Sequence, residues 1–418
     1  MRTPKFELSW INQKRVEVYP RLFFIAIWAV MVVNLLLHSG WQGGFGQIIG
    51  GDFIVFFSTG LIYKEDPSLI YDYNQQFLVQ QSLVKPIILR GVNPNINPPY
   101  VTPVYSILST VPLPWAFLLW TLCMVICTGA AITILMNMVP PQIKNYGLTS
   151  RQFTILVFSF FPLIESLLAG QNSALTFLLM TCVIFSMYKN KHFLAGLFAG
   201  IMIYKPQYVV GFLILWVVWK NYKSLLGFLI VAVAWTGAFY LANGIELYQT
   251  FLNLSKQFLQ LSYVEGFPGY ILVTLYGFLT TILPQSFQPY IYGTSVLVLM
   301  LSTFTLAIIA HKSRDKSLIE RTPVISLAIL FPLVATPYSQ LHDLVILIPG
   351  FVLWSLFFPS RGLLITVIGV YLGAFFLTFA GALSHIALNS LLVLGLTALV
   401  IYWIVNENKL KPLRQTGI

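Results

Sequence analysis

One carboxylate stands among glycines and aromatic residues in the stretch "GGDFIVFFSTGLIY", residues 50–63. Asp52 could act as a general base, because a carboxylate within hydrogen-bond reach of a hydroxyl makes that oxygen more reactive as its proton leaves. Asp is also a favoured helix N-cap, and a helix that begins at Phe53 would use it in that way. The spacing alone leaves both roles open.

Lys205 and His342 could bind an anionic group. Lys205 lies between two short apolar runs, where an ammonium group is costly unless it is paired, and a phosphate is a natural partner. His342 lies at a bend just before another apolar run. The alternatives are a lysine that snorkels to an interface and a histidine that caps the bend through a hydrogen bond. We expect both residues to contact a phosphate or a sugar.

The remaining polar candidates are less specific. Glu165 lies in an apolar run shortly before Gly170, and it is either a protonated structural residue or a ligand for acceptor hydroxyls. Gln171 and Asn172 either bind a sugar or form a polar turn, and Asp343 follows His342 on the same predicted side. Since no Asp-x-Asp pair accompanies these residues, we predict no metal site and no obligatory cofactor.

The composition indicates which kind of protein must position these residues. Hydrophobic residues make up 57% of the 418 residues, charged residues make up 9%, and the mean hydropathy is +0.80. These values predict an all-α polytopic membrane protein with about ten to twelve membrane helices. The net charge of +11 does not favour a nucleic-acid partner, because the basic residues form short clusters between apolar runs. The three cysteines lie inside apolar runs, where packing is their usual role.

The basic clusters predict the topology. They recur at every second boundary between apolar runs, which places them and both chain ends in the cytoplasm if the protein lies in the plasma membrane. The clusters include Lys144, Arg151, Lys189, Lys191, Lys220, Lys223, Lys312, Arg314, Lys316, Arg321, Arg361, Lys409, Lys411 and Arg414. We therefore expect a cytoplasmic segment at 1–21, one membrane domain at 22–405 and a cytoplasmic tail at 406–418. Most acidic residues, including Asp52 and Asp343, fall on or near the outer side.

Two long segments are predicted on the outer side, at 39–103 and 243–288. In the first, Phe53, Phe56 and Phe57 recur at helical spacing, which predicts an amphipathic helix anchored in the membrane interface. The proline-rich stretch "NPNINPPYVTPVY", residues 93–105, should stiffen the approach to the next membrane run.

One apolar run is too short to span a bilayer. Phe193–Tyr204 has twelve residues, or ~18 Å as a helix, and a second short run follows Lys205 and Pro206. Basic residues flank this pair of short runs on both sides. The segment 193–219 is therefore predicted to form a broken or half-depth helical hairpin with Lys205 at its tip, packed in protein or lining a cavity.

Six motifs in order resemble the polyprenol-phosphate-mannose-dependent mannosyltransferases of the GT-C superfamily of membrane glycosyltransferases. They are "GGDF" at 50–53, "YD" at 71–72, "NPPYVTPVYSILSTVPLP" at 97–114, "GQNSAL" at 170–175, "AGLFAGIMIYKP" at 195–206 and "ATPYSQLHDLVIL" at 335–347. The resemblance extends from about residue 20 to 360, and Glu165 departs from it, since a neutral residue is expected before the "GQN" bend.

The resemblance implies an inverting glycosyltransferase with Asp52 as the general base. The donor would be a polyprenyl-phosphate sugar, mannose by this likeness, and the acceptor a hydroxyl of a glycolipid or glycan on the outer face. Two other classes remain open: a lipid-linked glycan ligase, and a transporter or flippase of a lipid-linked sugar. A ligase would place its largest outer loop late in the chain, whereas here the first loop is the longest. A transporter should show facing charges on several long helices.

Overall fold

The computed structural model describes residues 13–140, 148–258, 263, 267–357 and 361–406. Within these ranges the chain forms helices and contains no β-strand, although three isolated bridges occur. The all-α prediction is thus confirmed. Lys144, Lys409, Lys411 and Arg414, and most of the two predicted terminal segments, lie outside the described residues.

Six of the described helices are long and apolar enough to cross a membrane. They are α1 (Gln13–Leu36), α5 (Leu113–Met136), α12 (Tyr222–Asn243), α15 (Gln288–Lys312), α16 (Leu318–Ala335) and α18 (Arg361–Ser384). The other apolar runs form a pair, α7 (Ser150–Phe158) and α8 (Phe161–Ala169), which is bent by 59°, and several shorter helices. The shorter helices include α9 (Ser173–Tyr188), α17 (Leu347–Phe357) and α19 (Asn389–Val405). The ten to twelve expected apolar runs therefore comprise full spans, one bent pair and short helices.

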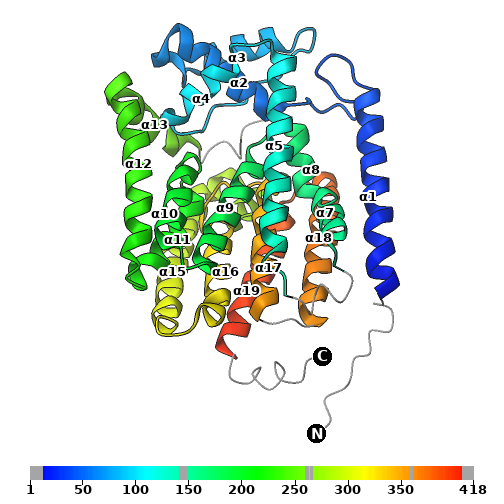
Figure 1. Cartoon of the computed structure of the whole chain (residues 1–418). Helices are drawn as coiled ribbons and strands as arrows, with labels where there is room; N and C mark the ends of the chain where they lie inside the picture. Colours follow the sequence, from blue (N-terminus) through cyan, green and yellow to red (C-terminus); the bar gives the residue numbers. More distant parts are fainter. Residues whose placement is uncertain (1–12, 141–147, 259–262, 264–266, 358–360, 407–418) are drawn as a thin grey trace.

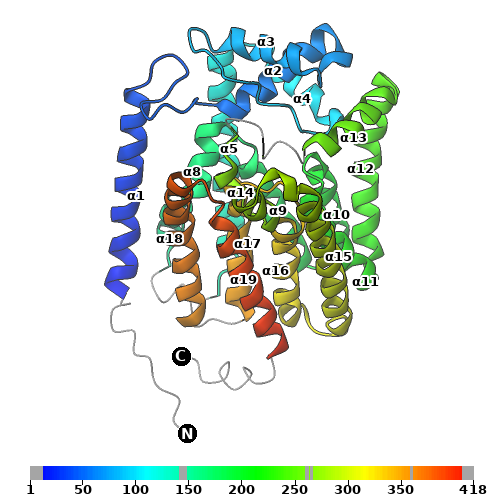
Figure 2. The same ribbon diagram turned by 180° about the vertical axis from the view of Figure 1, so that it is seen from behind.

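A layer of short helices covers one end of this bundle, and the start of α1 and the end of α19 lie at the other end (Figure 1). The layer consists of α2 (Gly51–Glu65), η1 (Pro67–Leu69), α3 (Tyr73–Leu83), η2 (Pro99–Val101) and α4 (Thr102–Leu108). Figure 2 shows the same layer from behind, with α13 (Glu246–Phe258) beside it at the end of α12. Tyr248 of α13 packs against Tyr100 of η2, with ring centroids 6.3 Å apart.

The predicted helix after Asp52 exists, but its aromatic side chains do not anchor it in the membrane interface. Phe53, Phe56 and Phe57 of α2 are all buried, and so are Ser58 and Thr59 beside them. The Phe56 ring stacks on Tyr105 of α4 at 4.7 Å. The interfacial prediction is therefore wrong, because these apolar side chains are buried within the protein and do not face lipid.

The remaining helices complete the bundle and its upper rim. At the end that carries the α2–α4 layer lie η5 (Gly269–Ile271), α14 (Leu275–Ile282), η6 (Gln285–Phe287) and η7 (Leu341–Ile346). A capping box at Ser317 and Glu320 starts α16, which runs with 13 of its residues buried up to the bend before η7. That bend brings His342 and Asp343 to the same end as α2.

The short segment after Lys191 forms a hairpin of two helices. α10 (His192–Ile201) and α11 (Gln207–Val218) contain 10 and 12 residues, or about 15 and 18 Å, well short of the ~30 Å hydrocarbon thickness. η3 (Met202–Tyr204) lies between them, directly before Lys205. α10 packs closely on α12, because a Cβ at Gly196 would lie 2.0 Å from the Ser224 carbonyl oxygen. The hairpin tip therefore lies within the protein, beneath the α2–α4 layer.

Candidate active site

Asp52 is held at the start of α2 by contacts with two distant parts of the chain. The N-cap of α2 is Gly50, which has a left-handed φ of 67° and no side chain to cap the helix. The Asp52 carboxylate instead accepts hydrogen bonds from Asn93 Nδ2 at 3.2 Å and from Gln171 Nε2 at 3.0 Å. Asp52 is only half-buried. Its position thus differs from that of an N-cap.

The turn between α8 and α9 fixes the position of Gln171 relative to Asp52. α8 ends at Gly170, which has a φ of 73°, and a Cβ at this position would lie 2.5 Å from the Phe53 Cβ. Trp120 Nε1 donates to the Gly170 carbonyl at 2.8 Å, and the Gly50 N–H donates to the Leu168 carbonyl at 2.7 Å. A glycine at 170 is therefore required by both backbone conformation and space, and it lets α2 lie directly against this turn.

Lys205 at the hairpin tip is paired with Asp343. Its Nζ donates to Asp343 Oδ1 at 3.0 Å, and the exposed fractions of the two side chains are 11% and 5%. The "NPPY" motif supports this tip, because Tyr100 Oη donates to the Ile203 carbonyl at 2.8 Å. Tyr204, the residue before Lys205, shares a 2.8 Å hydrogen bond with Thr176 of α9. The lysine is therefore neither snorkelling nor unpaired, but lies in a rigid protein environment.

His342 lies between two carboxylates. Its Nδ1 is 3.2 Å from Glu165 Oε2 and its Nε2 is 3.6 Å from Asp343 Oδ1. A protonated ring would thus face an acceptor from each nitrogen. Lys205 and His342 converge on the same oxygen of Asp343. Together Glu165, Lys205, His342 and Asp343 form what we call the charged cluster, in which opposite charges partly compensate each other below the surface.

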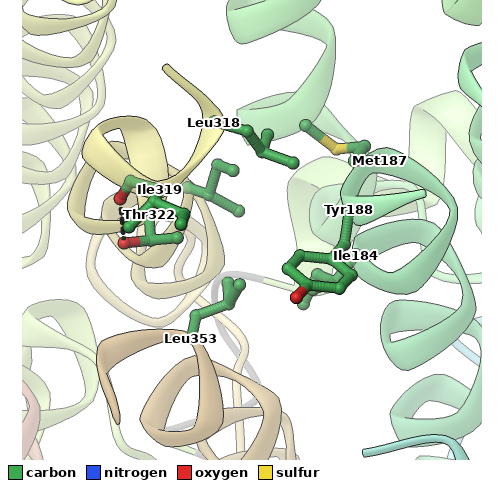
Figure 3. A pocket seen from close by; sticks show the side chains of 8 residues that line it. Ile184, Met187, Tyr188, Leu318, Ile319, Thr322 and Leu353 are labelled. Atoms are coloured by element: carbon green, nitrogen blue, oxygen red, sulfur yellow. Dashed lines mark hydrogen bonds between the residues drawn. The ribbon is translucent and has the colours of Figure 1, made fainter. Parts of the chain in front are cut away.

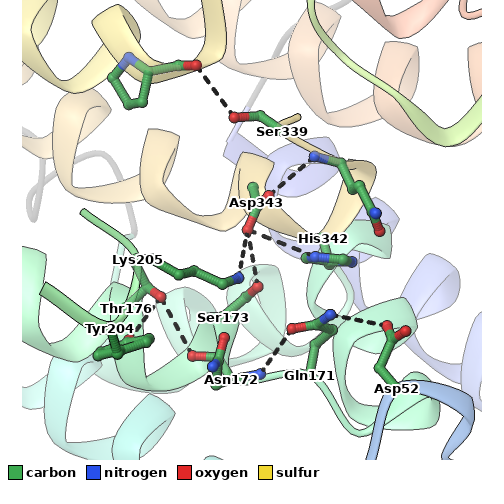
Figure 4. Close-up of polar contacts among 12 residues, drawn as sticks. Asp52, Gln171, Asn172, Ser173, Thr176, Tyr204, Lys205, Ser339, His342 and Asp343 are labelled. Atoms are coloured by element: carbon green, nitrogen blue, oxygen red, sulfur yellow. Dashed lines mark hydrogen bonds and ion pairs between the residues drawn. The ribbon is translucent and has the colours of Figure 1, made fainter. Parts of the chain in front are cut away.

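Three consecutive residues connect Asp52 with the charged cluster, as Figure 4 shows. Gln171 binds Asp52, and Ser173 Oγ donates to Asp343 Oδ1 at 3.3 Å. Asn172 lies between them and is 2% exposed, and its Oδ1 has no protein partner. Since consecutive Cα atoms are about 3.8 Å apart, the Cα atoms of Gln171 and Ser173 are at most roughly 7.6 Å apart. The Asp52 carboxylate and the charged cluster are thereby connected through one turn.

Two contact residues, Asn93 and Ser173, were not identified as site residues from the sequence. Both lie inside quoted motifs, Asn93 at the start of "NPNINPPY" and Ser173 directly after "GQN". A neutral asparagine in a proline-rich loop and a serine at a helix start are common structural residues, so neither stands out in the sequence as a site residue. Asp72 of the "YD" motif caps α3 by accepting from the Gln75 N–H at 2.7 Å.

An apolar pocket lies away from the charged cluster (Figure 3). Its lining includes Ile184, Met187, Leu318 and Leu353, which belong to the far end of α9, the start of α16 and α17. Ser173 begins α9 near the charged cluster, so the pocket lies toward the opposite end of that helix. It offers no charged side chain, and we do not assign it to the site. Within the described ranges, no group of three or more His, Cys, Asp or Glu residues is suited to hold a metal ion.

The comparison with known families identifies the chain more closely. The model of glycosyltransferase family 87 matches residues 95–337, more than half of the chain. This range contains Glu165, Gln171, Asn172 and Lys205, whereas Asp52, His342 and Asp343 lie outside it and are placed by the geometry alone. No curated protein and no solved structure matches the chain. The protein is therefore a membrane glycosyltransferase that belongs to glycosyltransferase family 87.

Proposed function

We propose that this protein transfers a sugar, mannose in the first instance, from a polyprenyl-phosphate donor to a hydroxyl of a glycolipid or glycan. The observation that carries the proposal is the turn 171–173, which connects the Asp52 carboxylate to the charged cluster around Asp343. Sugar transfer from a lipid phosphate needs both kinds of group, a proton acceptor for the attacking hydroxyl and cations for the departing phosphate.

The proposed reaction is a single displacement with inversion at the anomeric carbon. The acceptor oxygen forms a bond to that carbon while the bond from carbon to the phosphate oxygen breaks. The hydroxyl proton passes to Asp52, and the electron pair of the broken bond leaves with the lipid phosphate. That phosphate needs positive charge but no proton, which Lys205 and a protonated His342 would supply. No metal ion or other cofactor takes part in this scheme.

The remaining candidates receive roles that fit their positions. Glu165, which is near His342 and about a quarter exposed, would bind acceptor hydroxyls or keep His342 oriented. Gln171 holds Asp52, and Asn172 Oδ1 is a buried acceptor without a protein partner beside it. Asp343 orients Lys205 and His342. We further propose that the protein lies in the plasma membrane with the α2–α4 layer outside and both chain ends in the cytoplasm, in accord with the basic clusters.

Transfer of radiolabel from polyprenyl-phosphate mannose to an alkyl glycoside or to extracted glycolipids, in detergent, tests the activity. The glucose, arabinose and aminosugar donors serve as comparisons for sugar choice. Movement of the donor across a vesicle membrane without covalent transfer would support the transporter alternative. Release of a whole oligosaccharide from its lipid carrier would support the ligase.

Asp52→Asn tests the base. The amide keeps the size of the side chain and can still accept a hydrogen bond, but it cannot take the proton. We expect a folded protein that binds donor and loses about 10²- to 10⁴-fold in transfer rate, as is typical when a general base is removed. Transfer within a few-fold of wild type would remove Asp52 from this role and direct attention to Glu165 and Asp343.

A further inference from the structure

Glutamines of α3 hold the irregular segment that follows this helix. Residues 84–98 contain no helix or strand, so their backbone groups need other partners. Gln80 donates through Nε2 to the Asn93 carbonyl at 2.8 Å and accepts at Oε1 from the Asn93 N–H at 3.1 Å. Gln81 binds the Ile87 carbonyl at 2.7 Å and the Leu89 N–H at 2.9 Å in the same way. Both amide atoms of each glutamine are therefore used to fix this segment.

The Gln80 contacts fix the residue that touches Asp52. Asn93 is itself exposed, while Gln80 is only 2% exposed and rigidly held. A single side-chain hydrogen bond contributes about 1 kcal/mol, which is too little to keep an exposed asparagine of an irregular segment in one place. The two bonds from Gln80 to the Asn93 backbone provide the additional restraint, and Asn93 Nδ2 then reaches Asp52 Oδ1.

We propose that Gln80 is a positioning residue for sugar transfer, acting through Asn93 on the Asp52 carboxylate. Asn93 binds one carboxylate oxygen and Gln171 binds the other, so the orientation of the carboxylate plane is set from two sides. A base held in this way presents its remaining lone pairs to the acceptor hydroxyl in one direction. The inference depends on the proposed function, because it assumes that Asp52 takes the proton.

The experiment compares Gln80→Met with Gln81→Met. Methionine keeps an unbranched side chain of similar length and removes both hydrogen bonds. Gln81 is the matched control, since it makes the same pair of bonds from the same helix to the same segment, but to residues that do not touch Asp52. We expect Gln80→Met to lower kcat about 10- to 100-fold, with the donor KM within about 2-fold, because a misplaced catalytic group costs rate more than ground-state binding. Gln81→Met should keep kcat within about 2-fold of wild type.

Asn93→Ala provides the second variant and does not depend on the packing of α3. It should reproduce the kcat loss of Gln80→Met, and the double variant should be no slower than either one, because both changes remove the same restraint. Thermal unfolding in detergent checks that all variants are folded. A wild-type kcat in Gln80→Met, or equal kcat losses in Gln80→Met and Gln81→Met, would overturn the inference.

The failure of the proposed function would be visible separately. If Asp52→Asn still transfers sugar, the assignment of the base is wrong and the role of Gln80 falls with it. If Asp52→Asn is inactive while Gln80→Met and Asn93→Ala keep the wild-type kcat, only the positioning role is lost.

Discussion

The Lys205–Asp343 pair allows a test of whether Lys205 binds the donor phosphate or only neutralises Asp343, because the two roles predict different effects of Asp343→Asn on donor affinity. Lys205 Nζ is 3.0 Å from Asp343 Oδ1. If Lys205 serves only to neutralise Asp343, removal of either partner should disturb the site in a similar way. If Lys205 binds the donor phosphate, Asp343 competes with that phosphate for the same ammonium group. Removal of the Asp343 charge should then leave donor affinity unchanged or increase it.

The expected magnitudes follow from the burial of the pair. Loss of a hydrogen bond to a charged group costs about 1.5–3 kcal/mol, so Lys205→Met should weaken donor binding about 10- to 150-fold. Removing one partner of a buried ion pair costs about 3–5 kcal/mol of stability. Asp343→Asn should cost less than this, because the new amide oxygen can still accept from Lys205 and from Ser173. Both variants should therefore unfold at lower temperature than wild type, with Lys205→Met the less stable.

The assay is equilibrium binding of a non-transferable polyprenyl-phosphate sugar analogue to the detergent-solubilised protein, with thermal unfolding of the same samples. The expected pattern is weakened binding in Lys205→Met and unchanged or tighter binding in Asp343→Asn. Lys205→Arg should bind poorly, since the planar guanidinium does not replace the point charge of lysine. Equal losses of affinity in folded Lys205→Met and Asp343→Asn would refute the phosphate role, as would wild-type affinity in Lys205→Met.

Three further predictions use other parts of the structure. Glu165→Gln should raise the acceptor KM several-fold while donor affinity stays within about 2-fold, because the carboxylate would face acceptor hydroxyls; a changed donor affinity with an unchanged acceptor KM would contradict this. Gly170→Ala should lower the free energy of unfolding by about 1–3 kcal/mol, because the new Cβ would clash with Phe53 and because residue 170 has a left-handed φ. Gly129→Ala is the control: nothing lies within 4 Å of its Cβ position, so thermal unfolding should show a nearly neutral or stabilising effect. A cysteine at position 90 should react with an impermeant reagent from outside intact cells and a cysteine at position 223 should not; the reverse labelling would invert the topology.

Apolar runs and charge spacing predicted the class of fold and the short hairpin segment, since both depend on the length of continuous hydrophobic sequence. They could not predict the environment of α2. Periodicity reports which faces of a helix are apolar, but it does not distinguish lipid from protein as the partner. The small residues Ser58, Thr59 and Gly60 that accompany the aromatics are buried as well. The 59° bend between α7 and α8 was also not predicted, although Pro162 in the first turn of α8 marks it in the sequence.

Some residues of the candidate site could be predicted, because a charged side chain in an otherwise apolar stretch of sequence stands out. Lys205, His342 and Asp343 were chosen in this way, and the structure brings them together around one carboxylate. The sequence could not show that Lys205 is paired with Asp343, since 138 positions separate them. Asn93 was missed because its contact with Asp52 depends on the path of an irregular segment that local propensity does not determine.

The turn at 170–173 has a consequence for how this enzyme could be re-engineered. Asp52 and Asp343 are both hydrogen-bonded to side chains of the same short stretch, so their separation depends on residues 171–173. The irregular segment 84–98, by contrast, contacts this arrangement through Asn93. Libraries for directed evolution of acceptor choice should therefore leave both Asn93 and 170–173 constant, because both hold the Asp52 carboxylate, and should diversify Glu165.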